Sequence, residues 1–162
     1  MQNRFNVPNE VVDGLYYGNV RHAKDKEMLQ ELGITHIVNC YGEKVDSFEE
    51  YYDFLDDFLP IPIRDGNVDI KGYIDRVLQF IDGAISSGKR VFVHCKNGSS
   101  RSGAFVVAYI MRTKDMNFED AWDFVRQRRA VCCPNQYFRA QIIDHFGELS
   151  DPENPGQGSG EL

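Results

Sequence analysis

One segment restricts the fold of this chain more than any other. From Arg90 to Arg112, an apolar run, a polar loop and a helix that is apolar on nearly every side follow one another. The run Val91-Phe92-Val93 is bounded by polar residues, a pattern typical of a buried strand in a parallel sheet. A helix with apolar residues around its whole circumference is expected only where the element is buried. A buried strand that leads into a buried helix predicts an α/β fold.

The rest of the chain repeats this alternation of strands and helices. Apolar runs predict strands over 15–17, 34–39 and 58–63, with a loop over 64–69. Helical spacing predicts helices over 23–32, from residue 70 to a stop at Gly88, over 118–128 and over 136–146. We therefore expect a single α/β domain whose central, mainly parallel sheet of about five strands is flanked by helices.

Composition sets the expected boundaries of this domain. The segment 147–162 is rich in Pro, Gly and polar residues and has no periodic apolar pattern, so we predict a disordered acidic tail there. Residues 1–7 are predicted to form an N-terminal extension. The folded domain is expected over residues 8–146.

The loop after the buried strand carries the residues that suggest chemistry, His94-Cys95-Lys96-Asn97-Gly98-Ser99-Ser100-Arg101-Ser102-Gly103. A tight strand-to-helix loop points successive backbone N–H groups into one concavity, and the helix N-terminus adds a positive dipole end. Residues 96–101 are therefore predicted to bind a phosphate group. The same field favours the thiolate form of Cys95, which is a nucleophile. Arg101 is expected to clamp two phosphoryl oxygens.

A second cysteine fits the same spacing to an arginine, at Cys133 and Arg139. That segment contains no glycine, begins with a proline after the cysteine, and follows a charged loop in place of an apolar strand. We therefore do not expect a second site there.

The pattern His94-Cys95-x-x-Gly98-x-x-Arg101-Ser102 resembles the signature of the cysteine-based protein phosphatases, and in particular the small dual-specificity group. Gly14–Gly18 and Leu32–Asn39 are similar to the N-terminal pattern of that group. Pro134, Asn135, Phe138 and Gln141 are similar to its C-terminal pattern. The resemblance covers residues 8–146 and implies the phosphatase fold, with its phosphate-binding loop between a strand and a buried helix.

The resemblance also implies a two-step mechanism that needs no metal and no cofactor. Cys95 would attack the phosphorus to give a phosphocysteine, an acid would protonate the leaving oxygen, and water would then release phosphate. Ser102 would stabilise the departing thiolate. His94 is expected to orient the loop, and Asn135 to support the site. Asn39 either supports the loop or only makes a hydrogen bond at the end of its strand.

The general acid has two candidates in the loop over 64–69. The family places an aspartate about thirty residues before the nucleophile, just after a buried strand, and Asp65 fits that position. Asp69 is the alternative, because this loop is one residue shorter than is usual in the group. We favour Asp65.

Net charge limits the choice of partner. The chain has 18 Lys and Arg against 25 Asp and Glu, a formal charge of −7, which excludes bulk nucleic-acid binding. Seven of the acids lie within Glu43–Asp57, and four lie in the tail from Gly147. From Lys89 to Arg139, ten bases face four acids, so this stretch carries +6. The global charge is therefore compatible with phosphate capture at the loop.

No apolar run approaches the roughly 20 residues of a membrane span, and the N-terminus lacks the apolar stretch of a signal peptide. We expect a cytoplasmic protein, with the nucleus as an alternative, whose Cys40, Cys95, Cys132 and Cys133 remain thiols.

Neither these cysteines nor the four histidines show zinc-site spacing. Cys40, Cys132 or Cys133 could take part in redox regulation of Cys95. No feature of the sequence indicates an oligomeric state.

Three functions are compatible with these residues. The favoured one is hydrolysis of phosphotyrosine, with phosphoserine and phosphothreonine as further substrates, in phosphorylated proteins. The alternative is a phosphoinositide or inositol-phosphate phosphatase, since Lys96 directly follows the nucleophile, although Ser99 and Ser100 stand where such enzymes often carry a second base. A phosphate-binding pseudophosphatase adaptor is disfavoured, because Cys95, Arg101 and an acid are all present. Lys96 could equally be a solvent-facing side chain.

Overall fold

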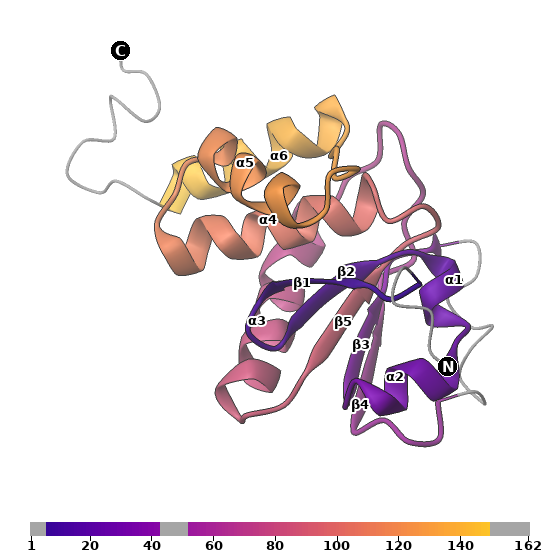
Figure 1. Cartoon of the computed structure of the whole chain (residues 1–162). Coiled ribbons are helices and arrows are strands. Elements are labelled where there is room, and N and C mark those ends of the chain that lie inside the picture. Colours follow the sequence, from indigo (N-terminus) through magenta and orange to yellow (C-terminus); the bar gives the residue numbers. More distant parts are fainter. Residues whose placement is uncertain (1–5, 43–51, 150–162) are drawn as a thin grey trace, which may run out of the picture.

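Five short strands form one sheet in the order β1-β2-β5-β3-β4 (Figure 1). The computed structural model describes residues 6–42 and 52–149. The strands are β1 (Asn9–Val12), β2 (Leu15–Gly18), β3 (His36–Asn39), β4 (Asp57–Pro60) and β5 (Val91–His94). β1 pairs antiparallel with β2, and the other three pairings are parallel. The predicted α/β domain with a mainly parallel sheet of about five strands is confirmed.

Side chains along each strand point alternately to the two faces of the sheet, and both faces are buried. Tyr16, Ile37 and Phe92 pack in a cluster with helices α1 (Val20–Ala23) and α2 (Lys26–Glu31). Their strand neighbours Tyr17, Val38 and Val93 belong to the larger cluster on the other face. That face is covered by the remaining helices (Figure 1), which are α3 (Lys71–Ser86), α4 (Arg101–Lys114), α5 (Phe118–Arg128) and α6 (Gln136–Leu149).

Strand β5 and helix α4 form the centre of the molecule. All four residues of β5 are fully buried, since β2 and β3 flank the strand and helices cover both of its faces. Helix α4 is buried from Arg101 to Met111. The loop that joins the two lies at the carboxyl ends of parallel strands β2, β3 and β5, the edge at which α/β folds place their ligands.

The structure differs from the predicted elements in several places. The helix expected over 23–32 begins later, as α2 at Lys26, because the Asp25 side chain accepts a hydrogen bond from the Met28 N–H at 3.1 Å and caps the helix there. The short helix α1, which precedes it, was not predicted. Strand β1 was not predicted. The strand expected over 58–63 pairs only as far as Pro60. Helix α6 continues to Leu149, past the expected end at residue 146.

Parts of the predicted termini lie outside the described residues, namely 1–5 of the N-terminal extension and 150–162 of the tail. Most of the acidic segment over 43–57 does too, since the description resumes at Tyr52. In the part of the chain that is described, no helix is both long enough and apolar enough to cross a membrane.

Candidate active site

The nucleophile candidate lies directly after the central strand. Cys95 follows β5 and is 2% exposed, and its Sγ lies 3.0 Å from the Oγ of Ser102 in the first turn of α4. Ser102 is fully buried. A hydroxyl at this distance can donate a hydrogen bond to a thiolate and stabilise its charge. The structure thus brings together the two residues that the sequence paired.

Arg101 opens helix α4 and is buried, with 6% of its surface exposed. Its Nη1 donates to the carbonyl of Ile63 at 3.1 Å, and its guanidinium carbon lies 5.4 Å from the centre of the Tyr41 ring. Ile63 lies two residues before Asp65. Arg101 therefore links the loop over 95–101, here called the phosphate loop, to the loop that carries the acid candidates.

The carbonyl groups of the phosphate loop are bonded to the surrounding scaffold. The carbonyl of Lys96 accepts from the Val20 N–H at 3.1 Å, and that of Ser100 from the Ala104 N–H at 2.8 Å. The Ser99 carbonyl accepts from the Tyr17 hydroxyl at 2.8 Å. In a planar trans peptide, the N–H of the next residue points the opposite way. The N–H groups of Asn97, Ser100 and Arg101 therefore point away from these bonds, a direction that suits an anion held inside the loop.

Gly98 allows the loop to make its tight turn. Its φ is +65°, and a Cβ at this position would lie 2.4 Å from Arg129 Nη2 and 2.6 Å from the Gly18 carbonyl oxygen. Both the backbone conformation and the space therefore demand glycine. Lys96 and Asn97, before Gly98, are exposed. Ser99 donates its hydroxyl to the Val131 carbonyl at 2.8 Å.

The two acid candidates have different partners. Oδ1 of Asp65 accepts from Nδ2 of Asn135 at 2.8 Å, and the same Nδ2 donates to the Gly66 carbonyl at 3.0 Å. The Asn135 N–H donates to the Ser100 hydroxyl at 3.0 Å, so Asn135 joins the acid loop to the phosphate loop. Oδ1 of Asp69 instead accepts from the Lys71 N–H at 3.0 Å, at the start of α3. Asp65 is thus tied to the phosphate loop through Asn135, whereas Asp69 bonds the first residue of α3.

His94 and Asn39 lie beneath the site. His94 is fully buried, its ring stacks on Phe92 with centroids 5.2 Å apart, and its Nδ1 donates to the Cys95 carbonyl at 3.2 Å. Burial lowers the pKa of His94 to about 4, so the ring is neutral at pH 7 and suited to orienting the loop. Asn39 accepts from the Tyr41 N–H at 2.8 Å at the end of β3. That bond fixes the turn that places Tyr41 beside Arg101.

The four cysteines are free thiols. Cys40 is buried, its N–H donates to the His94 carbonyl at 2.7 Å, and burial raises the pKa of its thiol. Burial raises the pKa of Cys132 to about 12, whereas Cys133 is exposed.

Arg139, which follows Cys133 at the same spacing as Arg101 follows Cys95, makes an ion pair with Glu119 and lies over the ring of Phe118. That second Cys–Arg pair is not a site. Within residues 6–42 and 52–149, no three His, Cys, Asp or Glu side chains are grouped to hold a metal ion.

Sequence reasoning did not find three residues around the phosphate loop. Tyr17 bonds Ser99, Tyr41 lies beside Arg101, and Nε of Arg129 donates to the Gly98 carbonyl at 2.8 Å. Arg129 is one of three basic residues between 126 and 129, and nothing in its spacing separates it from the other two. Only the fold, which brings the end of α5 to this loop, distinguishes it.

The comparisons with known proteins point to one family. A family model described as the dual specificity phosphatase catalytic domain matches residues 15–148. Human dual specificity protein phosphatase 1 is 36% identical over 146 residues, which are 90% of this chain and 39% of that protein. The crystal structure of the human tyrosine phosphatase-like serine/threonine/tyrosine-interacting protein aligns with a TM-score of 0.81 at 32% identity, over 89% of this chain and 98% of that one.

A mouse putative dual specificity phosphatase, solved in complex with zinc tungstate, aligns with a TM-score of 0.79 at 29% identity, over 88% of this chain and 87% of that one. The chain belongs to the dual specificity phosphatase family. It spans only 39% of the length of human dual specificity protein phosphatase 1.

Proposed function

We propose that this protein is a cysteine-dependent phosphatase that hydrolyses phosphotyrosine, and also phosphoserine and phosphothreonine, in phosphorylated proteins. The observation that carries the proposal is the placement of the Cys95 sulfur 3.0 Å from the Ser102 hydroxyl, in a loop whose carbonyls are bonded outward. A thiolate at the base of a ring of N–H donors lies where a phosphorus atom would be held.

The reaction proceeds in two steps. The Cys95 thiolate attacks the phosphorus, so that an S–P bond forms while the P–O bond to the leaving oxygen breaks. That oxygen takes a proton from the Asp65 carboxyl group. Water then attacks the phosphocysteine and gives a proton to the Asp65 carboxylate, and the S–P bond breaks. The products are the free hydroxyl and inorganic phosphate.

Three groups stabilise charge along this path. The loop N–H groups and the Arg101 guanidinium face the phosphoryl oxygens, on which charge accumulates in the transition state. The Ser102 hydroxyl donates to the sulfur as the thiolate departs. Asn135, which bonds Asp65 at 2.8 Å and the Ser100 hydroxyl at 3.0 Å, ties the proposed acid to the phosphate loop. The mouse relative was solved as a complex with zinc tungstate, and tungstate is a tetrahedral oxyanion like phosphate.

Phosphoproteins suit the loop better than inositol phosphates. Polyanionic substrates call for further cations in the loop, and here Ser99 and Ser100 bond the scaffold through Val131 and Asn135. Lys96 is exposed to solvent. The four free thiols fit a reducing compartment, so we propose that the protein acts in the cytoplasm or the nucleus.

The test is the release of phosphate from a phosphotyrosine peptide, a phosphothreonine peptide and a phosphoinositide, measured in parallel. We expect wild type to act on the peptides, and Cys95→Ser to lose at least about 10³-fold in turnover, because its nucleophile is gone. Cys133→Ser is the matched control, since Cys133 is exposed and has the same spacing to an arginine, and it should retain full activity.

Three outcomes would contradict the proposal. Full activity in Cys95→Ser would remove the mechanism. A clear preference for the phosphoinositide would replace the substrate class. Binding of phosphopeptides by wild type without any release of phosphate would identify an adaptor instead of an enzyme.

A further inference from the structure

One basic side chain from outside the phosphate loop bonds directly to the backbone of that loop. Arg129 is the C-cap residue that directly follows helix α5, and it is half-buried. Its Nε donates to the Gly98 carbonyl at 2.8 Å, and its Nη2 lies 3.4 Å from the Asn97 carbonyl oxygen. Its Nη1 donates to Oδ1 of Asn9 on strand β1 at 2.8 Å. Each of the three nitrogens of the guanidinium therefore faces an oxygen of the protein itself.

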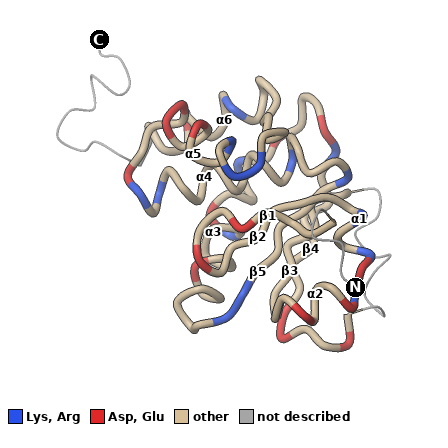
Figure 2. The backbone as a smooth tube through the Cα atoms, in the orientation of Figure 1, with Lys and Arg blue, Asp and Glu red and all other residues tan. Residues whose placement is uncertain are grey.

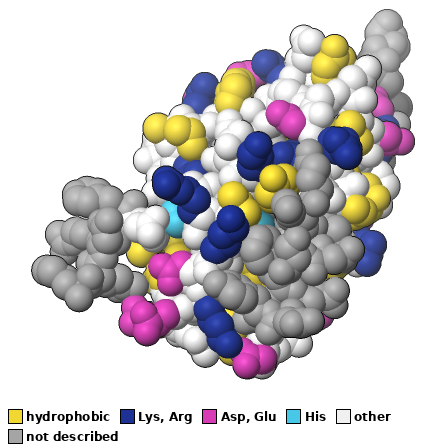
Figure 3. All heavy atoms as spheres, turned by 90° about the vertical axis from the view of Figure 1, so that its right-hand side faces the viewer, with side chains coloured by type: hydrophobic (Ala, Val, Ile, Leu, Met, Phe, Trp, Pro, Cys, Tyr) yellow, Lys and Arg dark blue, Asp and Glu magenta, His cyan; other side chains and the backbone are white. Residues whose placement is uncertain are grey.

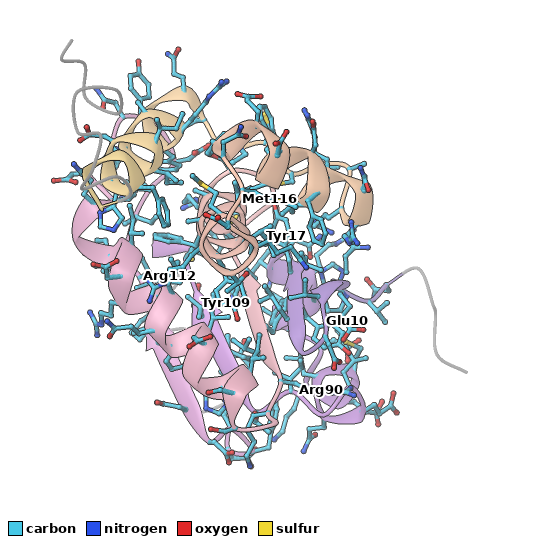
Figure 4. The ribbon with its side chains drawn as sticks, turned by 90° about the vertical axis from the view of Figure 1, so that its left-hand side faces the viewer. Glu10, Tyr17, Arg90, Tyr109, Arg112 and Met116 are labelled. Atoms are coloured by element: carbon cyan, nitrogen blue, oxygen red, sulfur yellow. The ribbon has the colours of Figure 1, made fainter. Side chains whose placement is uncertain are left out.

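The ring of Tyr17 supports this guanidinium. The guanidinium carbon of Arg129 lies 5.2 Å from the ring centre of Tyr17, which is fully buried. Tyr17 lies between the sheet and helix α4 (Figure 4), and a Cβ on Gly103 of α4 would lie only 2.6 Å from its hydroxyl. That hydroxyl donates to the Ser99 carbonyl at 2.8 Å. A rigid aromatic ring thus fixes the plane of Arg129 and itself holds the next carbonyl of the loop.

The direction of these bonds decides the direction of the loop N–H groups. Because the peptide plane is rigid, a carbonyl held outward at Asn97, Gly98 or Ser99 turns the N–H of the next residue to the opposite side. The peptides that follow Asn97 and Gly98 are held in this way by one planar group, which a lysine ammonium could not bond with the same geometry. The donors of Arg129 are directed at the backbone, so its effect on a phosphate passes through the loop.

We propose that Arg129 is a positioning residue of the phosphate loop, which aims the N–H groups of the loop at the phosphate by holding the carbonyls of Asn97 and Gly98 outward. This role deepens the proposed phosphatase function and rests on it. Asn9 anchors the other side of the guanidinium, so edge strand β1 also contributes to the arrangement.

The experiment measures the affinity for tungstate by calorimetry in a Cys95→Ser background, in which no covalent step can follow. We expect Arg129→Met to raise the Kd for tungstate by roughly 10- to 100-fold, the effect of losing two backbone hydrogen bonds. Arg129→Lys should show an intermediate rise in Kd, since lysine keeps the charge but lacks the planar set of N–H donors that bonds two carbonyls at once. With the Cys95 thiol restored, Arg129→Met should raise KM and lower kcat.

Arg128→Met is the matched control. Arg128 is the neighbouring residue, carries the same charge and is exposed, and its Nη1 donates to the Phe124 carbonyl of its own helix at 3.1 Å. We expect its Kd for tungstate to stay within about twofold of the parent. Thermal melting of each variant separates loss of the fold from loss of affinity. If Arg129→Met does not fold, Asn9→Ala should still raise the Kd, since it removes the anchor of Nη1.

Two results would overturn the proposal. Equal tungstate affinities in Arg129→Met and Arg128→Met would show that Arg129 does not orient the loop. Full affinity in Arg129→Lys would show that only its charge matters. Failure of the proposed function is a separate result, because a protein that releases no phosphate still reports on Arg129 through tungstate binding.

Discussion

Asn135 joins the acid loop to the phosphate loop, although it lies 70 residues from Asp65 and 35 residues from Ser100 in the chain. Its side-chain amide holds the Asp65 carboxylate, and its backbone N–H holds the Ser100 hydroxyl. Its Oδ1 accepts from the Phe138 N–H at 2.9 Å, which fixes the amide at the start of α6. One residue thus fixes the position of the acid candidate relative to the phosphate loop, although Asp65 itself is exposed.

The assignment of the acid predicts opposite results for two neighbouring carboxylates. Asp65→Asn should lower turnover of a phosphoserine peptide, whose leaving group is poor, by about 10²–10⁴-fold, because no proton reaches the leaving oxygen. Phosphocysteine formation should remain detectable. Asp69→Asn should stay near wild type, since an asparagine oxygen can still accept from the Lys71 N–H. Full activity in Asp65→Asn together with loss in Asp69→Asn would reverse the assignment.

At the scale of single residues, sequence reasoning succeeds where the chemistry is local in the chain. Cys95, Arg101 and Ser102 lie within one run of eight residues, so their spacing alone brings them together. Asp65 and Asn135 were expected only through a family resemblance. Arg129, Tyr17 and Tyr41 were missed because their contacts to the loop depend on tertiary packing, which leaves no periodic or spacing signal.

Helix α1 is only one turn long, and its stability depends on its N-terminal cap. The Asn19 side chain accepts from the His22 N–H at 3.1 Å, and the Asn19 N–H donates to Nδ1 of His22 at 3.0 Å. This is a capping box with histidine in place of the usual Glu or Gln. His22 is 5% exposed, and burial together with the nearby Arg129 lowers its pKa to about 4.

Burial of His22 in this cap, and of His94 in the sheet, makes the stability of the folded state depend on pH. In the unfolded chain, histidine binds a proton near pH 6.5, whereas folded His22 and His94 do so only near pH 4. The unfolded state thus binds more protons in this window, and stability falls as the pH drops from about 6.5 to 4. Between pH 7 and pH 5, each histidine should remove about 2 kcal/mol from the free energy of unfolding.

His22→Gln tests this at the level of the helix. Glutamine can still accept from the Asn19 N–H, but it does not titrate. Urea unfolding of wild type and variant at pH 7, 6 and 5 should give a loss on acidification that is about half as large in the variant, with His94 supplying the rest. Parallel pH dependences of the two proteins would contradict the buried, neutral state of His22.

Most elements were predicted because their apolar periodicity is strong. Strand β5 and helices α3, α4 and α5 are buried on one face or on all faces, so apolar residues recur along their sequences in a regular pattern. Strand β1 was missed because it lies at the sheet edge, where only Val11 of its four residues is buried. The start of α2 depends on a single cap at Asp25, which periodicity does not register.

Over the whole molecule, charge is kept away from the centre of the sheet. Strands β2, β3 and β5 contain no Lys, Arg, Asp or Glu, and most charged residues lie on helices and loops (Figure 2). On the face shown in Figure 3, Lys and Arg side chains gather around the centre. Within the acidic segment over 43–57, Asp53 pairs with Lys26 at 2.8 Å and Asp56 with Lys89 at 3.0 Å.

The charge distribution predicts a salt-dependent selection between substrates. Replacing the seven acids of residues 43–57 by amides should raise kcat/KM several-fold for a doubly phosphorylated peptide relative to a singly phosphorylated one at about 0.01 M salt. The difference should shrink at about 0.15 M, where screening is stronger. The same ratio in variant and wild type at low salt would mean that the segment does not discriminate between substrates.

The strand order has a consequence for how the protein is made. β5 lies between β2 and β3, yet it follows them in the chain by more than fifty residues. During synthesis, the hairpin of β1 and β2 and the pair of β3 and β4 are therefore not joined into one sheet until β5 leaves the ribosome and pairs with β2 and β3. That same strand delivers Cys95, so the nucleophile becomes available only when the sheet closes. Catalytic activity should thus return on refolding together with the complete sheet, and a partly folded chain should carry no active loop.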